Sequence, residues 1–291
     1  MSHVIEIEHL TKSYGKHRGV IDLSFAVEEG DIFGFLGPNG AGKSTTIRSM
    51  LGLIHYEAGA IRIFGMDAKT EREKILREIG YMPSEAMFYP SMKVSDVIRL
   101  AADMRRKDCG EEAKKLCERL QVDTNKRIEE LSLGNRKKVS IVCAMQHQPK
   151  LFVFDEPTSG LDPLMQAEFF ALIEEYGKKG ATCLLSTHVL SEVKKYCKNV
   201  AIMKEGRLQC IDSVENLTNT NAKHVRVVKD GVAEEFVWKG DLNKLFQNLS
   251  GHDISDILIE EPSLDEIFMH YYEKNKEDQP EILEGMKGGE K

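Results

Sequence analysis

GPNGAGKS, residues Gly37–Ser44, is the stretch of sequence that decides the fold. It matches the pattern GxxxxGK[ST] in full. The short apolar run 31–36 before it indicates a buried strand, and residues 43–54 after it are predicted to be helical. In this strand–loop–helix order, the glycines let backbone N–H groups turn inward around phosphate oxygens, and the positive N-terminal end of the helix adds attraction. A chance match in a Gly-rich turn would lack this context.

The residue types in the loop suit the phosphates of a nucleotide. Lys43 would neutralise the β- and γ-phosphates, the Ser44 hydroxyl is a ligand for Mg²⁺, and Thr45 adds a contact on the α-phosphate side. The predicted nucleotide-binding residues of this segment are Gly37, Pro38, Asn39, Gly40, Ala41, Gly42, Lys43, Ser44 and Thr45.

Composition limits the class of protein. Of 291 residues, 41% are hydrophobic and 30% charged, which is typical of a soluble globular chain with a sizeable core. The net charge of −7 argues against a general attraction to nucleic acid. No segment has the ~20 apolar residues that span a bilayer, and no secretory signal is recognisable, so we expect a cytoplasmic chain. The six cysteines show no CxxC spacing and are expected to be reduced structural thiols rather than zinc ligands.

The pattern along the chain predicts an α/β fold. Strands and helices alternate over residues 1–215, which implies a parallel sheet covered by helices. Residues 85–150 interrupt the alternation with apolar residues at helical spacing and are predicted to form a helical insert. A small α+β unit is expected at 216–275, ending in a helix capped by Ser263, and the polar tail 276–291 is expected to be disordered.

Two acidic residues follow the apolar strand 151–154. A carboxylate at the carboxyl end of a buried strand points into the cleft where open α/β sheets bind ligands. Asp155 would therefore hold Mg²⁺, and Glu156 would orient or deprotonate the attacking water. An Asp-Glu pair alone is a weak signal, but beside a phosphate loop it is a strong one.

Four further motifs carry a family resemblance. LSLGN (131–135) resembles the LSGGQ signature of ATP-binding cassette (ABC) proteins, and SGLD (159–162) resembles their D-loop. His188 resembles their switch histidine, and Tyr14 lies where the family stacks an aromatic ring on adenine. The resemblance covers residues 4–215 in the family's order, and it implies a P-loop NTPase cassette with a helical insert.

The resemblance also implies a mechanism. Two cassettes would face head to tail, so that Ser132 and Gly134 of one contact the γ-phosphate held by Lys43 of the other. His188 would hydrogen-bond the γ-phosphate, and Asp162 would link the two sites. The implied cofactors are ATP and Mg²⁺. The implied roles are catalysis for Glu156, His188 and Lys43, nucleotide contacts for Tyr14, Ser132 and Gly134, and metal binding for Ser44 and Asp155.

Simpler interpretations stay open for three of these residues. A lone histidine such as His188 is often structural, Tyr14 could be an ordinary tyrosine at a strand end, and Ser132 could only cap the following helix. The chain also departs from the family pattern. Ser84 occupies the position of the usual Gln, so that either a water bridges the gap or Glu85 substitutes for it, and we expect slower or differently coupled hydrolysis.

The tail 261–272 (EPSLDEIFMHYY) resembles the end of stand-alone cassettes of bacterial two-component exporters. This implies export of an amphipathic peptide or drug-like molecule through a separate permease of about six helices, at the cytoplasmic face of the membrane. The permease would dock in a groove built from residues around 85–105. The cluster Met87, Phe88, Tyr89 and Met92 is either that contact patch or core of the insert.

Two other classes of protein fit the sequence less well than a transporter ATPase. An ABC ATPase acting on ribosomes or nucleic acid would carry two cassettes or long coiled coils, whereas this chain has one phosphate loop, no sustained heptads and an acidic balance. A GTPase or kinase with the same loop would lack LSLGN and STH at these places.

Overall fold

The computed structural model describes residues 2–15, 17–85, 87–218 and 222–260. The chain divides into two compact units, Met1–Val214 and Glu215–Lys291. The helix predicted to begin at Ser263, the exporter-like segment 261–272 and the tail 276–291 lie outside the described residues.

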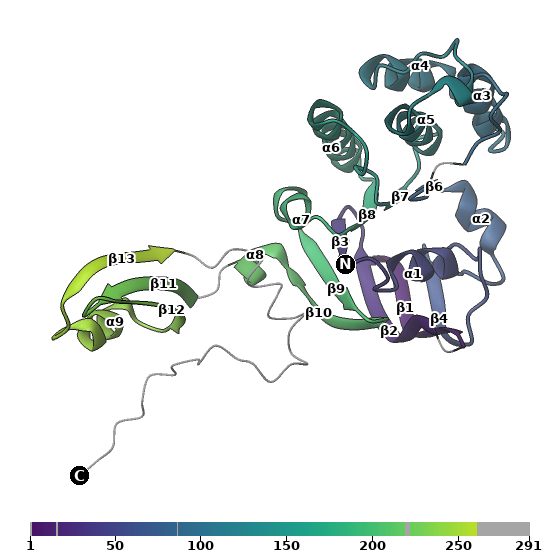
Figure 1. The fold of residues 1–291 in the computed structure, drawn as a ribbon. Coiled ribbons are helices and arrows are strands. Elements are labelled where there is room, and N and C mark those ends of the chain that lie inside the picture. Colours follow the sequence, from purple (N-terminus) through teal and green to yellow (C-terminus); the bar gives the residue numbers. More distant parts are fainter. Residues whose placement is uncertain (1, 16, 86, 219–221, 261–291) are drawn as a thin grey trace. The chain divides into compact units, whose positions relative to one another are not determined.

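A six-stranded sheet forms the centre of the first unit (Figure 1). Its strand order is β10-β9-β3-β8-β7-β6, and every pair except β10–β9 is parallel. The parallel sheet predicted from the sequence is therefore confirmed, with one antiparallel strand added at its edge. The bounds are β3 Ile32–Leu36, β6 Ile79–Met82, β7 Leu151–Asp155, β8 Thr182–Thr187, β9 Asn199–Lys204 and β10 Arg207–Ser213.

Helices α1 (Lys43–Met50), α2 (Arg72–Arg77), α6 (Pro163–Lys178) and α7 (Leu190–Tyr196) lie along this sheet. Helix α6 begins where local chemistry dictates, because the Asp162 side chain accepts a hydrogen bond from Met165 N at 3.0 Å and Pro163 occupies the first turn. Helix α1 is shorter than the predicted 43–54. It ends at Met50, and Gly52 then adopts a φ of +64°, which stops the helix.

An antiparallel sheet of order β2-β1-β4-β5 packs beside the phosphate loop. The apolar side chains Ile5, Ile7 and Leu10 of β1 are buried in the main core with Ile61 and Ile63 of β4. Neither β4 nor β5 was predicted from the sequence. The bounds are β1 His3–Tyr14, β2 His17–Glu28, β4 Ala58–Ile63 and β5 Met66–Asp67.

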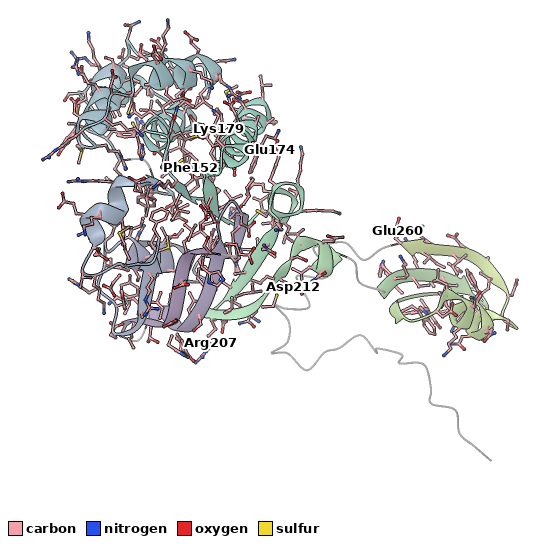
Figure 2. The ribbon with its side chains drawn as sticks, turned by 180° about the vertical axis from the view of Figure 1, so that it is seen from behind. Phe152, Glu174, Lys179, Arg207, Asp212 and Glu260 are labelled. Carbon is pink, nitrogen blue, oxygen red and sulfur yellow. The ribbon has the colours of Figure 1, made fainter. Side chains whose placement is uncertain are left out.

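The insert is helical, as predicted. It contains α3 (Val94–Asp103), α4 (Gly110–Arg119), a 3₁₀ turn (Ile128–Glu130) and α5 (Leu133–Met145). Ion pairs from Arg119 of α4 to Glu168 and Glu175, each at 2.5 Å, hold the insert to α6. In Figure 2, Glu174 of α6 and Lys179, which follows this helix, are labelled on the outside of the unit, and Phe152 is labelled in its interior.

The second unit is a small α+β structure. Its three-stranded antiparallel sheet has the order β12-β11-β13, and one helix packs on it. Its core contains Val225, Val227, Trp238, Leu245 and Leu249. The elements are α8 (Val214–Thr218, which begins at the junction), β11 (Ala222–Lys229), β12 (Val232–Lys239), α9 (Leu242–Leu249) and β13 (Ile254–Glu260). Among all the described residues of the chain, no helix is both long and apolar enough to span a bilayer.

Candidate nucleotide site

The predicted phosphate loop connects the end of β3 to the start of α1. Gly40 and Gly42 adopt left-handed backbone angles, with φ of +81° and +103°. A side chain at Gly42 would be strained and would press on the carbonyl oxygen of Gly19 at 3.2 Å. Pro38, Asn39 and Gly40 are exposed at the rim, whereas Gly37 and Ala41 are buried and Ser44 and Thr45 are half-buried. The loop is therefore a backbone cradle that is open on one side.

Lys43 is buried, with only 5% of its surface exposed. Its Nζ donates hydrogen bonds to the carbonyl oxygens of Gly37 at 2.5 Å and Pro38 at 3.4 Å, and lies 3.2 Å from Oε1 of Glu156. A buried ammonium group at the N-terminus of a helix is a strong anchor for an anion. The loop residues and the acidic residue predicted from the sequence are thus brought into direct contact.

Asp155 ends strand β7 and is completely buried. Its Oδ1 accepts a hydrogen bond from the Ser186 hydroxyl at 2.9 Å, while Oδ2 is buried without a hydrogen-bond partner. An unpaired buried carboxylate oxygen is costly unless something else completes it. Mg²⁺ is typically held by one or two carboxylates together with substrate phosphates, so the orphaned oxygen fits that ion.

Glu156 and His188 face each other across the ends of β7 and β8. The His188 Nδ1 and Glu156 Oε2 atoms are 2.7 Å apart, and His188 is about half exposed. Glu156 adopts a left-handed backbone, with a φ of +51°. Lys43, Glu156 and His188 therefore form a continuous chain of contacts, which the sequence indicated only through three separate motifs.

A lysine that sequence analysis did not single out belongs to this group. Lys137 of α5 is 2% exposed, and its Nζ donates a hydrogen bond to the main-chain carbonyl of Glu156. Burial lowers the pKa of its ammonium group, while the neighbouring Glu156, Asp155 and Glu192 carboxylates oppose that change. Its position three residues after Gly134, on one face of the helix, was the only signal in the sequence.

Ser132 and Gly134 lie at the N-terminus of α5. The Ser132 hydroxyl accepts a hydrogen bond from Asn135 N at 3.3 Å and so caps the helix. A Cβ at Gly134 would lie 2.6 Å from the carbonyl oxygen of Gly160, so only glycine fits against this loop. Within the described part of the chain, no hydrogen bond joins Ser132 or Gly134 to Lys43, Glu156 or His188.

Tyr14 lies at the end of β1, and its side chain is 44% exposed. The Lys12 ammonium lies 5.1 Å from the centre of its ring. An exposed aromatic ring beside a cation can stack on a planar base, so the surroundings of Tyr14 are compatible with the predicted contact.

A groove of about 530 Å³ lies between the first unit's core and its helical insert. Met87 and Tyr89 are 87% and 73% exposed, and Phe88 and Met92 are half-buried. The alternative that these four side chains form core of the insert is therefore wrong for Met87 and Tyr89. The groove is lined by Leu51, Leu53, Glu73, Leu76, Arg77, Ile79, Tyr81, Pro83, Met87, Phe88, Ala101, Met104, Arg105, Arg106, Ser140 and Cys143.

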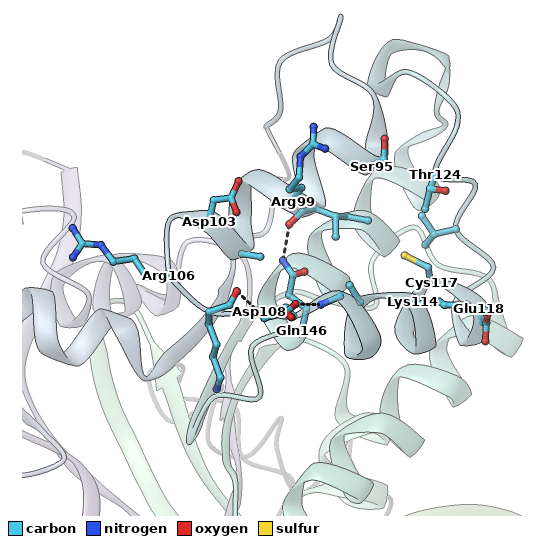
Figure 3. A pocket seen from close by; sticks show the side chains of 17 residues that line it. Ser95, Arg99, Asp103, Arg106, Asp108, Lys114, Cys117, Glu118, Thr124 and Gln146 are labelled. Carbon is cyan, nitrogen blue, oxygen red and sulfur yellow. Dashed lines mark hydrogen bonds and ion pairs between the residues drawn. The ribbon is translucent and has the colours of Figure 1, made fainter.

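A larger hollow of about 940 Å³ lies within the helical insert (Figure 3). The Gln146 side chain points toward α3, where its Nε2 donates to Ile98 O at 2.9 Å. Charged residues of both signs, including Arg99, Asp103 and Lys114, are among those that line the hollow. The hollow shares no lining residue with the phosphate loop.

Residues 20–159 match the family model described as "ABC transporter". The bacitracin transport ATP-binding protein BcrA of Bacillus licheniformis is 33% identical over 92% of this chain and 97% of its own length. This chain belongs to the ABC transporter ATP-binding proteins. The linearmycin resistance ATP-binding protein LnrL of Bacillus subtilis is 30% identical over 80% of this chain and 78% of its own length. A solved ATP-binding subunit of an ABC transporter is 28% identical, with a TM-score of 0.72 over 92% of this chain and 99% of that one.

Membership identifies the chain as an ATP-binding, ATP-hydrolysing subunit with the P-loop cassette fold. The resemblance inferred from LSLGN, SGLD and STH is therefore confirmed at the level of family, fold and ATPase activity. The roles of single residues in an ABC ATPase remain predictions for this chain.

Proposed function

We propose that this ABC ATPase binds ATP in the loop Gly37–Thr45 and uses Glu156 as its catalytic base. The contact chain Lys43–Glu156–His188 is the observation that carries the proposal. Lys43 would exchange its bonds to Gly37 and Pro38 for the phosphates, and its ion pair with Glu156 would then be released. Glu156 would be free to take a proton from water, and His188 would orient the γ-phosphate and that water.

Ser44 and Asp155 would hold Mg²⁺, which supplies charge neutralisation to the β- and γ-phosphates when it is bound. The orphaned Oδ2 of Asp155 supports this assignment. Ser186 would keep the carboxylate in place through its bond to Oδ1. Tyr14 would stack on the adenine ring.

Ser132 and Gly134 would complete the site of a second cassette. Within the described part of the chain no hydrogen bond joins them to Lys43, Glu156 or His188, and Ser132 is exposed at a helix N-terminus, where backbone N–H groups favour an anion. Gly134 sits against Gly160 and Leu133 is 62% exposed, so the helix end is free to meet a partner. The partner would be a second copy or a similar cassette.

We infer that ATP hydrolysis powers export of a peptide or drug-like molecule through a separate permease of about six helices. The names of the relatives BcrA and LnrL, for bacitracin transport and linearmycin resistance, support this substrate class. The groove beside Met87 and Met104 supports a docking partner, because both apolar side chains are more than three-quarters exposed. Arg106 is exposed in its lining and favours an amphipathic helix with an acidic residue, whereas Arg77 is already paired with Glu73. The chain would then be peripheral, at the cytoplasmic face of the membrane.

Co-purification tests the transport function. The tagged chain is expressed with the membrane protein encoded beside it and extracted in mild detergent. A stoichiometric complex with a six-helix protein, whose addition changes the ATPase rate, is the expected result. Recovery with ribosomes or nucleic acid, and no membrane protein, would overturn it.

A further inference from the structure

The backbone of Glu156 is held in an unusual conformation. A non-glycine residue with a φ of +51° is strained, and such strain persists only where the surroundings over-determine it. The N–H of Glu156 donates to the carbonyl oxygen of Ser186 at 2.9 Å, which fixes one side of the residue to β8. The other side, the Glu156 carbonyl, accepts a hydrogen bond from Lys137.

Lys137 reaches this carbonyl from a different part of the chain. It belongs to the first turns of α5, the helix that begins with the LSLGN motif. The same end of α5 packs on the Glu156 loop a second time, because Gly134 lies against the carbonyl of Gly160. Two contacts from one helix end thus brace the loop that carries Glu156.

The surroundings of Lys137 strengthen its hydrogen bond to the carbonyl oxygen of Glu156. It is 2% exposed, so its ammonium group has lost nearly all of its water and the charge-assisted bond to a carbonyl oxygen is strong. Its charge also faces Asp155, Glu156 and Glu192, which offset the burial. Lys43 could leave Glu156 for a phosphate, whereas Lys137 contacts the main chain and would stay.

We propose that Lys137 is a positioning residue for hydrolysis, which holds the Glu156 backbone in its left-handed conformation so that the carboxylate faces Lys43 and His188. The inference rests on the proposed role of Glu156 as the base. Lys137 touches neither nucleotide nor water in this scheme. It ties the signature helix of a subunit to the catalytic carboxylate of the same subunit.

The test is Lys137→Met, which keeps the length of the side chain and removes its donor. A misplaced base costs rate and leaves nucleotide binding intact. We expect kcat to fall about 10- to 100-fold, with the KM and the Kd for ATP changed by less than about twofold. In the nucleotide-free chain, amide hydrogen exchange of residues 155–160 should speed up, while the melting temperature stays near that of the parent.

Lys138→Met is the matched control, because Lys138 is the next residue of the same helix and is also buried, at 8% exposed. It should leave exchange of residues 155–160 unchanged. If Lys137→Met lowers only the melting temperature, or alters kcat and exchange no more than Lys138→Met does, then Lys137 is merely structural and the inference is wrong.

Glu156→Gln separates this inference from the proposed function. If Glu156→Gln keeps its turnover, the assignment of the base fails. If Glu156→Gln abolishes turnover while Lys137→Met leaves kcat and exchange unchanged, only the Lys137 inference fails. Adding Lys137→Met to Glu156→Gln should lower the residual rate by less than about threefold, because both changes act on the same group.

Discussion

The phosphate-loop site and the groove lined by Met87 and Met104 differ in the kind of side chain that they bury and the kind that they expose. Around the loop, charged groups are buried and paired: Lys43 contacts Glu156, and Lys137 contacts the Glu156 carbonyl. In the groove, apolar groups are exposed, and Met87 and Met104 are 87% and 78% exposed. Burying paired charges costs desolvation and is typical of chemistry, whereas exposing apolar surface is typical of binding. The contrast supports the proposals that catalysis belongs to one region and partner binding to the other.

Breaking the charged region should have the largest effect. Glu156→Gln removes the base while keeping the shape of the side chain, so turnover is expected to fall about 10²- to 10⁴-fold. ATP binding should persist, since Lys43 is released from its ion pair, and dimers should accumulate with ATP. Phosphate release and gel filtration measure the two effects. Glu205→Gln is the control, because Glu205 shares the φ of +51° outside this site. Near-parental turnover in Glu156→Gln would contradict the assignment.

Breaking the groove should separate partner binding from catalysis. Met87→Glu places a charge on the apolar lining, and we expect permease affinity to fall about 10-fold or more. ATP turnover of the isolated chain should not change. Pull-down with the permease and phosphate release check the two halves of the prediction. The control is Val232→Glu, at an exposed apolar position of the second unit. Undiminished permease binding by Met87→Glu would remove the groove from the docking surface.

His147 adds a third case to this comparison of buried and exposed side chains. It is a buried ionisable residue to which no catalytic or binding role is assigned. Burial, followed by the charge of Arg105, lowers its pKa to about 3. The unfolded chain binds this proton below about pH 6.5 while the folded chain does not, so stability falls as the pH drops from 6.5 toward 3. Between pH 6.5 and 5 the loss is about 2 kcal/mol in the free energy of unfolding.

His147→Gln keeps a donor for the carbonyl of Ile79, which lies 3.2 Å from Nε2 of His147, and removes the titration. Denaturant unfolding at pH 7 and pH 5 should show a smaller difference for the variant than for the parent. Equal pH dependence in both chains would mean that His147 is not the responsible group.

The same contrast explains what sequence could predict. The phosphate loop, Asp155 and Glu156 were predicted from local patterns next to strands, whereas His188 was predicted only from its resemblance to the switch histidine of the family. Lys137 was missed, because its contact with Glu156 depends on packing between elements 19 residues apart. The strand β4 (AGAIRI) was missed because Gly and Ala weaken its pattern. The exposure of Met87 stayed undecided, since core and contact patch use the same residue types.

Ser84 offers the smallest and sharpest test of the charged region. It is half-buried and follows β6, whose last residue, Met82, pairs with Phe154 of β7, so Ser84 lies close to the end of β7 where Asp155 stands. Gln has a longer side chain with an amide that reaches farther toward water and Mg²⁺. We therefore expect Ser84→Gln to raise turnover by about threefold, which corresponds to less than 1 kcal/mol in the barrier. Steady-state phosphate release with and without the permease measures rate and coupling together. Glu85→Ala is the companion variant: a slower rate would mean that Glu85 substitutes for the missing Gln. Unchanged rate and coupling in Ser84→Gln would show that the serine is a neutral departure from the family pattern.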